Sequence, residues 1–329
     1  MRQPAFEWTR PGHWLYQLWH RPRAAVARSV REGGPVAQWK THRARQAMRM
    51  AAAALPTLPV RSPGEGDACL VFLTGARYWE QTAFCLRSFQ IHAPDRLWPV
   101  LLVDDGTLSP AMTRRLASAF PGLHIVSGTP LQQALDARLP SGRFPTLREH
   151  RMRFTLLRKL TDVHAARPGA NLVLDADMLF HRRPDALIDW LGDPSLPIVM
   201  TDFKESYGYG RARLSTLVTG PIPTLVNTGV CGMSSSAMDW DNLEHWTRTL
   251  LSTHGSSYFL EQALTALLLS GTPHRQLPPA DYIVAPNTDE ILQPKACLHH
   301  YVDLAKRGYF RHAWRGFAGG SPARMGAPS

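Results

Sequence analysis

Residues 171–180 read Asn-Leu-Val-Leu-Asp-Ala-Asp-Met-Leu-Phe, an apolar run that meets two carboxylates and then becomes apolar again. The first part of this stretch predicts a strand that is buried on both faces, as in parallel sheets. Open α/β sheets bind their ligands at the carboxyl ends of such strands. Asp175 and Asp177 are therefore predicted to bind Mg²⁺ or Mn²⁺, because these cations prefer hard oxygen ligands and in turn bind diphosphates well.

Strand and helix patterns alternate around this stretch. Apolar runs at 69–73, 99–103 and 123–126 predict strands, and the segments between them have helical periodicity. This order is typical of the first half of a doubly wound, nucleotide-binding sheet.

The later part of the chain continues the same alternation. Helices are expected at about 149–166, 240–250 and 258–269, and strands at 198–200 and 225–230. Residues 127–150 predict a less regular connection, and residues 204–220, rich in Gly, Tyr and Arg, predict a mobile loop that shapes the acceptor site.

Composition limits the class of protein. A chain of 329 residues with 44% hydrophobic and 19% charged residues can bury a full α/β core. No run of 18 apolar residues is present, and the first residues lack the pattern of a secretory signal. Four scattered cysteines (Cys69, Cys85, Cys231 and Cys297) fit reduced thiols. We therefore expect a cytoplasmic protein.

Residues 1–66 differ from the rest of the chain. They contain 11 of the 37 basic residues against 3 of the 26 acidic ones, and they include several tryptophans. They predict a basic, aromatic-rich helical extension that ends in a linker at 61–66. Residues 1–60 either contact the inner face of an anionic membrane peripherally or pack on the next domain. No basic-aromatic recognition motif accompanies the charge, so no nucleic acid is expected. A catalytic domain is expected at 67–315, followed by a disordered tail at 316–329.

Four motifs follow one another along the catalytic domain. They are Lys159-Leu160, which lies 16 residues before Asp175; the segment Val226-Asn227-Thr228-Gly229-Val230; the pair Glu261-Gln262; and His300 with Lys306. Together with Asp175-Ala176-Asp177 they resemble the retaining, glycogenin-like glycosyltransferases (family 8) of the GT-A fold. The resemblance covers about residues 69–314. It implies an α/β, GT-A-like fold of the Rossmann-type, doubly wound kind, with a mixed central sheet and helices on both faces.

The resemblance also implies roles for individual residues. His300 is the third metal ligand beside Asp175 and Asp177, with His299 as the alternative. Lys159 and Lys306 contact the donor and its diphosphate. Asn227 and Gly229 line the sugar site, Glu261 and Gln262 lie near the reacting carbon, and Ala176, between the two aspartates, belongs to the donor-binding residues. The chain departs from the family pattern at Asp303, where the family has Gly, at Arg307-Gly308, which replaces Pro-Trp, and at Glu261, which replaces Asp.

The nucleotide end of the site is expected at the first two strand ends. Tyr78 and Thr74 are candidates for stacking on the base and for contacts to the ribose or diphosphate. Asp104, in Val103-Asp104-Asp105-Gly106, resembles the aspartate that reads uracil in inverting family 2 transferases; the alternative is that it caps the turn. Structural roles also remain open for Lys159, His300, Asn227 and Glu261.

The function expected from these motifs is metal-dependent transfer of a sugar from a nucleotide-diphosphate donor, such as a UDP-sugar. The acceptor is a hydroxyl group of a glycan, a lipid-linked glycan or a small molecule. Retention is favoured over the inverting, family-2-like alternative. The non-enzymatic alternative is a membrane-associated scaffold with an inactive transferase fold.

Overall fold

The computed structural model describes residues 33–319. Two compact units meet between Ala47 and Met48, and one helix, α3 (Gly34–Ala52), crosses that boundary. Helix α3 lies within the extension at 1–66 that is expected to be helical, before the linker expected at 61–66. Residues 1–32 of that extension and residues 320–329 of the expected tail lie outside the described residues. No helix in the described part of the chain is long and apolar enough to span a bilayer.

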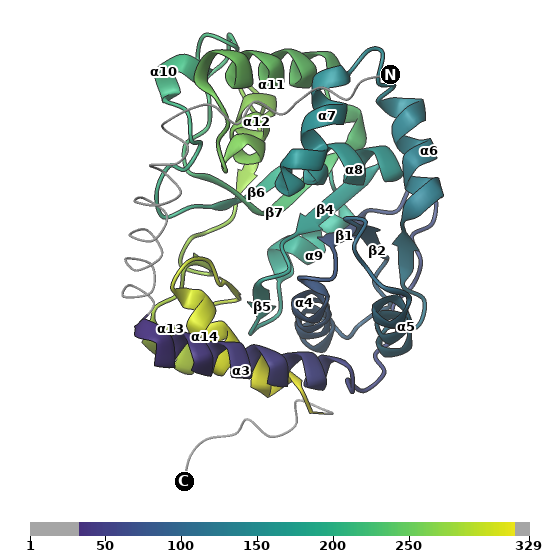
Figure 1. Ribbon diagram of the computed structural model, residues 1–329, viewed down its shortest axis with the longest axis vertical. Helices are drawn as coiled ribbons and strands as arrows, with labels where there is room; N and C mark the ends of the chain where they lie inside the picture. Colours follow the sequence, from purple (N-terminus) through teal and green to yellow (C-terminus); the bar gives the residue numbers. More distant parts are fainter. Residues whose placement is uncertain (1–32, 320–329) are drawn as a thin grey trace, which may run out of the picture. The chain divides into compact units, whose positions relative to one another are not determined.

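The second unit is built on a seven-stranded sheet (Figure 1). Its strand order is β3 (His124–Val126), β2 (Val100–Asp104), β1 (Cys69–Thr74), β4 (Ala170–Leu174), β7 (Val226–Ser234), β6 (Ile198–Thr201) and β8 (Arg275–Gln276). Strands β3, β2, β1 and β4 are parallel, whereas β7 runs antiparallel to both β4 and β6. The central sheet is therefore mixed, as expected.

Helices cover both faces of this sheet because its strands are apolar on both sides. Val71 and Val173 face a core that includes Leu160 of α8 (Arg158–Ala166). Phe72 is also fully buried, and α4 (Trp79–His92) contacts the same strand, β1. Further helices of this unit include α5 (Pro110–Ala119), α6 (Gly128–Arg138), α9 (Asp185–Gly192), α11 (Trp240–His254) and α12 (Leu260–Leu268).

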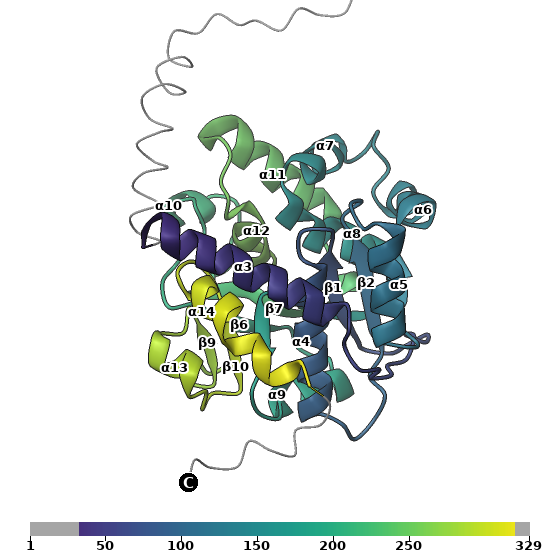
Figure 2. The same ribbon diagram turned by 60° about the horizontal axis from the view of Figure 1, so that its bottom comes forward.

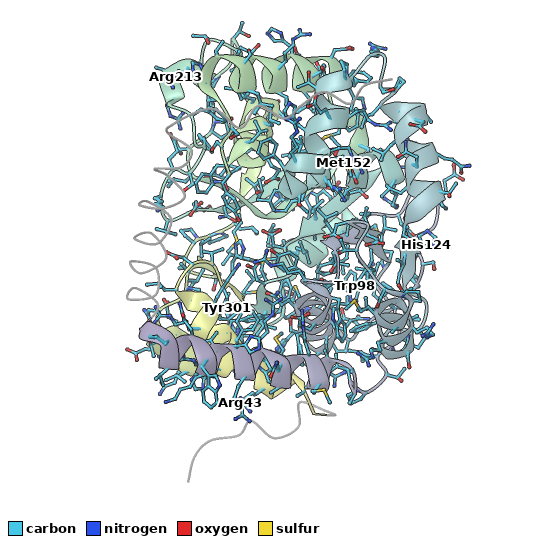
Figure 3. All side chains as sticks on the ribbon, in the orientation of Figure 1. Arg43, Trp98, His124, Met152, Arg213 and Tyr301 are labelled. Atoms are coloured by element: carbon cyan, nitrogen blue, oxygen red, sulfur yellow. The ribbon has the colours of Figure 1, made fainter. Side chains whose placement is uncertain are left out.

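A smaller sheet stands beside the end of β4. Its order is β5 (Met178–Phe180), β10 (Leu298–His300) and β9 (Tyr282–Val284). Figure 2 shows this sheet beside α13 (Thr288–Leu292) and α14 (Ala305–Arg311). Tyr301, labelled in Figure 3 together with Trp98, is fully buried just after β10. The chain after the two aspartates therefore leaves the central sheet and pairs with the C-terminal part of the unit.

The helix expected at 149–166 is interrupted. The structure has α7 (Pro145–Arg153), a 3-10 turn (Thr155–Leu157) and α8, because Phe154 has an extended backbone. The side chain of Arg158 donates from Nε to the carbonyl oxygen of Arg151, which compensates for the hydrogen bonds lost at the break. The connection at 127–150, expected to be less regular, contains helix α6.

The segment at 204–220, expected to be mobile, is packed against its surroundings. Tyr207 is buried and its hydroxyl donates to the carbonyl oxygen of Pro223. Tyr209 bonds to Gly255 in the same way. Leu214, in the short helix α10 (Arg211–Leu214), is fully buried. These contacts fix the loop beside α11.

Order also extends beyond the expected ends of the catalytic domain. Val60 is buried, and Arg61, in the segment expected to be a linker, pairs with Pro99 beside the sheet. At the other end, a 3-10 helix (Ala313–Phe317) buries Phe317, and Arg87 donates to the carbonyl oxygen of Gly319. Residues 48–66 and 316–319 thus belong to the second unit.

Candidate active site

The two aspartates lie where the two sheets meet. Strand β4 ends at Leu174, and the backbone nitrogen of Asp175 donates to the carbonyl oxygen of Gly229 in β7 (2.8 Å). The carbonyl oxygen of Asp177 accepts from the backbone nitrogen of Tyr301, just after β10 (2.8 Å). Ala176 lies between them in the bend. Backbone pairing on both sides therefore fixes the position of the acidic pair.

His300 completes a cluster with these aspartates. Its Nε2 lies 3.5 Å from Oδ2 of Asp175 and 3.3 Å from Oδ1 of Asp177. One potential ligand atom from each of the three residues lies within 4.8 Å of the others. Ligands of one Mg²⁺ ion lie up to about 4.2 Å apart, so small side-chain shifts would allow all three to share an ion. Two carboxylates and one imidazole therefore fit the hard divalent cation expected from the sequence.

His300, rather than His299, faces the acidic pair. The two residues are neighbours in β10, so their side chains point to opposite faces. The ring of His299 lies 4.7 Å from the ring of His181, and its Nδ1 is 3.4 Å from the hydroxyl of Tyr301. Burial lowers the pKa of His299 to about 4. His299 is thus part of a buried, uncharged aromatic cluster.

Two lysines contact the acidic pair. Lys159, in the first turn of α8, has its Nζ 2.6 Å from Oδ1 of Asp175, and Nζ of Lys306 is 3.0 Å from Oδ2 of Asp177. Burial disfavours the charge on Lys159, but the carboxylates of Asp175 and Glu261 outweigh it and raise its pKa. The carboxylate of Asp177 raises the pKa of Lys306. Both ammonium groups are therefore charged at neutral pH.

The pKa of Asp177 is lowered by the same contacts. Burial alone would raise it, but Lys306 and His300 outweigh the loss of solvation and keep the carboxyl ionised. The side chain is only 13% exposed. The carboxylate of Asp177 thus keeps its negative charge just beyond the end of β4.

Glu261 and Thr228 form a second polar contact beside Lys159. The hydroxyl of Thr228 donates to Oε2 of Glu261 (2.7 Å), and Nζ of Lys159 donates to the carbonyl oxygen of Thr228 (3.2 Å). Nζ of Lys159 lies 3.9 Å from Oε2 of Glu261. Burial raises the pKa of Glu261 to about 7, although Lys159 and Thr228 oppose the shift. The carboxyl group can therefore change its protonation state near neutral pH.

A buried aspartate that the sequence did not single out organises the remaining polar groups. Oδ2 of Asp202 accepts from Nδ2 of Asn227 (3.1 Å) and from Nε2 of Gln262 (3.4 Å). Asn227 accepts in turn from the backbone nitrogen of Gly229 (2.9 Å). Asp202 directly follows the apolar strand β6, so the strand-end rule that selected Asp175 would also have selected it.

Glycine at position 229 leaves room for the histidine of the cluster. A Cβ atom there would lie 2.5 Å from Cε1 and Nδ1 of His300 and 2.9 Å from Oδ1 of Asn227. The absence of a side chain at Gly229 therefore lets the backbone of β7 lie against the imidazole.

The residues expected at the nucleotide end differ in their contacts. Tyr78 is half-buried and close enough to Lys306 to contribute to the raised pKa of that lysine. Thr74 is buried, and its hydroxyl pairs with that of Thr82 (2.7 Å). Oδ1 of Asp104 accepts three backbone N–H groups in the turn at 106–108. The side chains of Thr74 and Asp104 thus make structural contacts, and the contact of Tyr78 with the donor stays a prediction.

Asp303, which departs from the family motif, has a positive φ of 49°. This left-handed conformation favours glycine, and aspartate is one of the few other residues that tolerate it. The backbone at this position would therefore also accept a glycine without strain. The turn leads from His300 to Lys306, and both side chains reach the acidic pair from opposite ends of it.

Comparison with solved structures identifies the fold. The chain is similar to the galactosyltransferase LgtC in complex with donor and acceptor sugar analogues, with a TM-score of 0.51 and 14% sequence identity over 76% of this chain and 95% of LgtC. It is also similar to the bifunctional glycosyltransferase WbbM (TM-score 0.49, 14% identity), covering 77% of this chain and 51% of WbbM, and so spans about half of that protein. Mouse xyloside xylosyltransferase 1 gives a TM-score of 0.47 at 11% identity, covering 74% and 97% of the two chains.

The mixed seven-stranded sheet with helices on both faces and the similarity to LgtC place this chain in the GT-A fold of glycosyltransferases. The fold expected from the sequence is confirmed. No family model and no curated protein sequence matches this chain.

Proposed function

We propose that the chain is a metal-dependent glycosyltransferase of the glycogenin-like type, which moves a sugar from a nucleoside-diphosphate donor, such as a UDP-sugar, to a hydroxyl acceptor. The observation that carries the proposal is the convergence of Asp175, Asp177 and His300 with two charged lysines on a GT-A fold. Two carboxylates and an imidazole suit Mg²⁺ or Mn²⁺, and cationic side chains beside them suit a diphosphate.

Each residue has a task that follows from its contacts. Asp175, Asp177 and His300 would hold the cation, which when bound would supply positive charge to neutralise the diphosphate. Lys159 and Lys306 would place their ammonium groups beside the leaving oxygens, where negative charge develops. Asn227 and Gln262, oriented by Asp202, would present amide groups to the sugar. Lys306 is the more exposed lysine, so it is the one that entering phosphates reach first.

Retention of configuration is the outcome favoured here. The inverting alternative was suggested by the resemblance of Asp104 to a uracil-reading aspartate, but that carboxylate caps its own turn. The region around Glu261 and Gln262 provides a carboxyl group whose pKa is about 7 and an amide beside it. These two groups are the ones we assign to the neighbourhood of the reacting carbon.

The proposal is tested by incubating the full chain with Mn²⁺ and a panel of UDP- and GDP-sugars. We expect slow hydrolysis of one donor, and transfer once a hydroxyl acceptor is supplied. Asp175→Asn should abolish the Mn²⁺-dependent rate while circular dichroism shows an intact fold. Unchanged turnover in this variant would refute the metal site. Absence of nucleotide-sugar turnover and of nucleotide binding in the wild type would favour the non-enzymatic scaffold.

A further inference from the structure

The loop between β1 and α4, residues 75–78, lies at the same edge of the sheet as Asp175, because β1 and β4 are parallel neighbours. It follows the first strand of the doubly wound part of the sheet, at the carboxyl edge where such folds bind phosphates. Tyr78 ends the loop and occupies the position before α4. The position of this loop therefore influences how a nucleoside diphosphate fits the site.

Arg49 contacts this loop from outside the sheet. It belongs to the last turn of α3, which is anchored in the second unit by the buried side chains of Met48 and Ala52. Its Nε lies 3.2 Å from Oε1 of Glu80, and its Nη2 donates to the carbonyl oxygen of Ala76 (3.4 Å). One guanidinium thus bonds both the middle of the loop and the first turn of α4.

The opposite side of the loop is held by the turn after β2. The backbone nitrogen of Ala76 donates to Oγ1 of Thr107 (2.9 Å), whose hydroxyl donates to Oδ1 of Asp105 (2.5 Å). A Cβ atom on Gly75 would lie only 2.0 Å from the same carboxylate oxygen, so the loop runs tightly against this turn. Ala76 is therefore bonded through its nitrogen to one element and through its oxygen to another.

The carboxylate of Glu80 gives Arg49 a second effect. The side chain of Glu80 is fully buried in the first turn of α4, close to where an anionic ligand would meet the N-terminus of this helix. A buried negative charge at that place opposes the binding of phosphates, and the guanidinium 3.2 Å away offsets it.

We propose that Arg49 is a positioning residue for the nucleotide donor: it fixes the β1–α4 loop and offsets the charge of Glu80 beside the phosphate site. This inference rests on the proposed function, because it assumes that the loop meets a nucleoside diphosphate. It adds a residue from the N-terminal helix, outside the sheet, to the set that determines donor affinity.

The test compares the full chain with Arg49→Ala, Arg49→Lys and Glu80→Gln, and uses Arg61→Ala as the matched control. Arg61 also pairs with a carboxylate, that of Asp67, but at the opposite end of β1 from the loop. Hydrogen exchange of the amides at 75–81 without any ligand reports the loop, and calorimetric titration with UDP or GDP plus Mn²⁺ reports nucleotide affinity.

We expect Arg49→Ala to accelerate exchange in the loop and to weaken nucleotide binding about tenfold, the equivalent of about 1.4 kcal/mol. Arg49→Lys should restore part of the affinity, because lysine keeps the charge but lacks the planar fork that reaches both partners. Glu80→Gln should combine faster exchange with a smaller loss of affinity. Exchange and affinity equal to those of Arg61→Ala would overturn the proposal.

The two proposals fail separately. If the wild type binds neither UDP nor GDP in the presence of Mn²⁺, the proposed function is wrong, and so is the role of Arg49 in donor affinity. If the wild type binds a nucleotide and Arg49→Ala binds it equally well, only the role of Arg49 is wrong.

Discussion

Replacement of Gly229 by alanine tests the metal site without removing any of its ligands. The new Cβ would lie 2.5 Å from Cε1 and Nδ1 of His300, whereas an ordinary contact of such an atom begins at 3.4 Å. The imidazole must therefore retreat by roughly 1 Å, or the backbone of β7 must move. Overpacking of this kind costs about 1–3 kcal/mol of folding stability.

The same displacement acts on metal affinity. Nε2 of His300 would leave its position 3.3–3.5 Å from the two carboxylates, while both aspartates stay in place. Misplacing the support of a metal-binding histidine typically lowers affinity by about 10–100-fold. We therefore expect Gly229→Ala to bind Mn²⁺ about 100-fold more weakly than the wild type.

A thermal-shift titration with Mn²⁺ measures this effect. At a concentration 100 times the wild-type Kd, the ion stabilises the wild type by about 2.7 kcal/mol but a 100-fold weaker variant by only about 0.4 kcal/mol. The control is Gly232→Ala in the same strand, whose Cβ would lie 2.6 Å from Cγ2 of Ile198 and 2.8 Å from Cε2 of Trp190. This variant should be destabilised but should keep the Mn²⁺-dependent shift.

The comparison separates a metal effect from general overpacking. Loss of the Mn²⁺ shift in Gly229→Ala alone supports the cluster of Asp175, Asp177 and His300 as a cation site. An equal Mn²⁺ shift in Gly229→Ala and the wild type, with Gly229→Ala correctly folded, would refute the reasoning.

Two further predictions concern stability. Asp303→Gly should raise the free energy of unfolding by up to about 1 kcal/mol in urea titrations, because glycine adopts the positive φ of 49° without strain; a decrease would show that the carboxylate matters more. Burial lowers the pKa of His164 from 6.5 to about 4, so the unfolded chain binds the extra proton first and stability falls as the pH drops from 6.5 to 4. His164 contributes up to about 3 kcal/mol to this loss of stability. In urea titrations at pH 7 and pH 4.5, His164→Asn should lose less unfolding free energy between the two pH values than the wild type. An equal loss in both proteins would contradict the prediction.

The fold could be predicted because its signals are local. The strands that flank Asp175 are short apolar runs, and Ser109, which accepts from the backbone nitrogen of Met112, marks the start of α5 through its side chain. The interruption at Phe154 could not be predicted in the same way. It depends on Arg158 reaching back to the carbonyl oxygen of Arg151, a contact that no periodic pattern contains.

The candidate site likewise contains residues whose place could be predicted from local sequence and residues whose place could not. The geometric role of Asp175 follows from its place at the end of a buried strand, and the inward direction of Thr74 follows from the two-residue period it shares with Phe72. The hydroxyl of Thr74 pairs with that of Thr82, and the candidate contact of Thr74 with the donor stays a prediction. The role of Asp202 depends on amides from β7 and α12, which are distant in sequence and meet only in the folded chain.

The two cations that bond the acidic pair are lysines rather than arginines, and this choice suits a site in which ionic partners change. Lys159 and Lys306 are two of the few lysines in a chain whose 37 basic residues are mostly arginines, and each bonds one aspartate of the pair. An ammonium group is a compact charge that can turn from one oxygen to another, whereas a guanidinium fork is matched to one planar partner. In the proposed transferase, each lysine would thus leave its aspartate for a phosphate oxygen once a cation bound that carboxylate. Donor and cation should therefore strengthen each other's binding at this site, a coupling that reciprocal titrations of Mn²⁺ and UDP would detect.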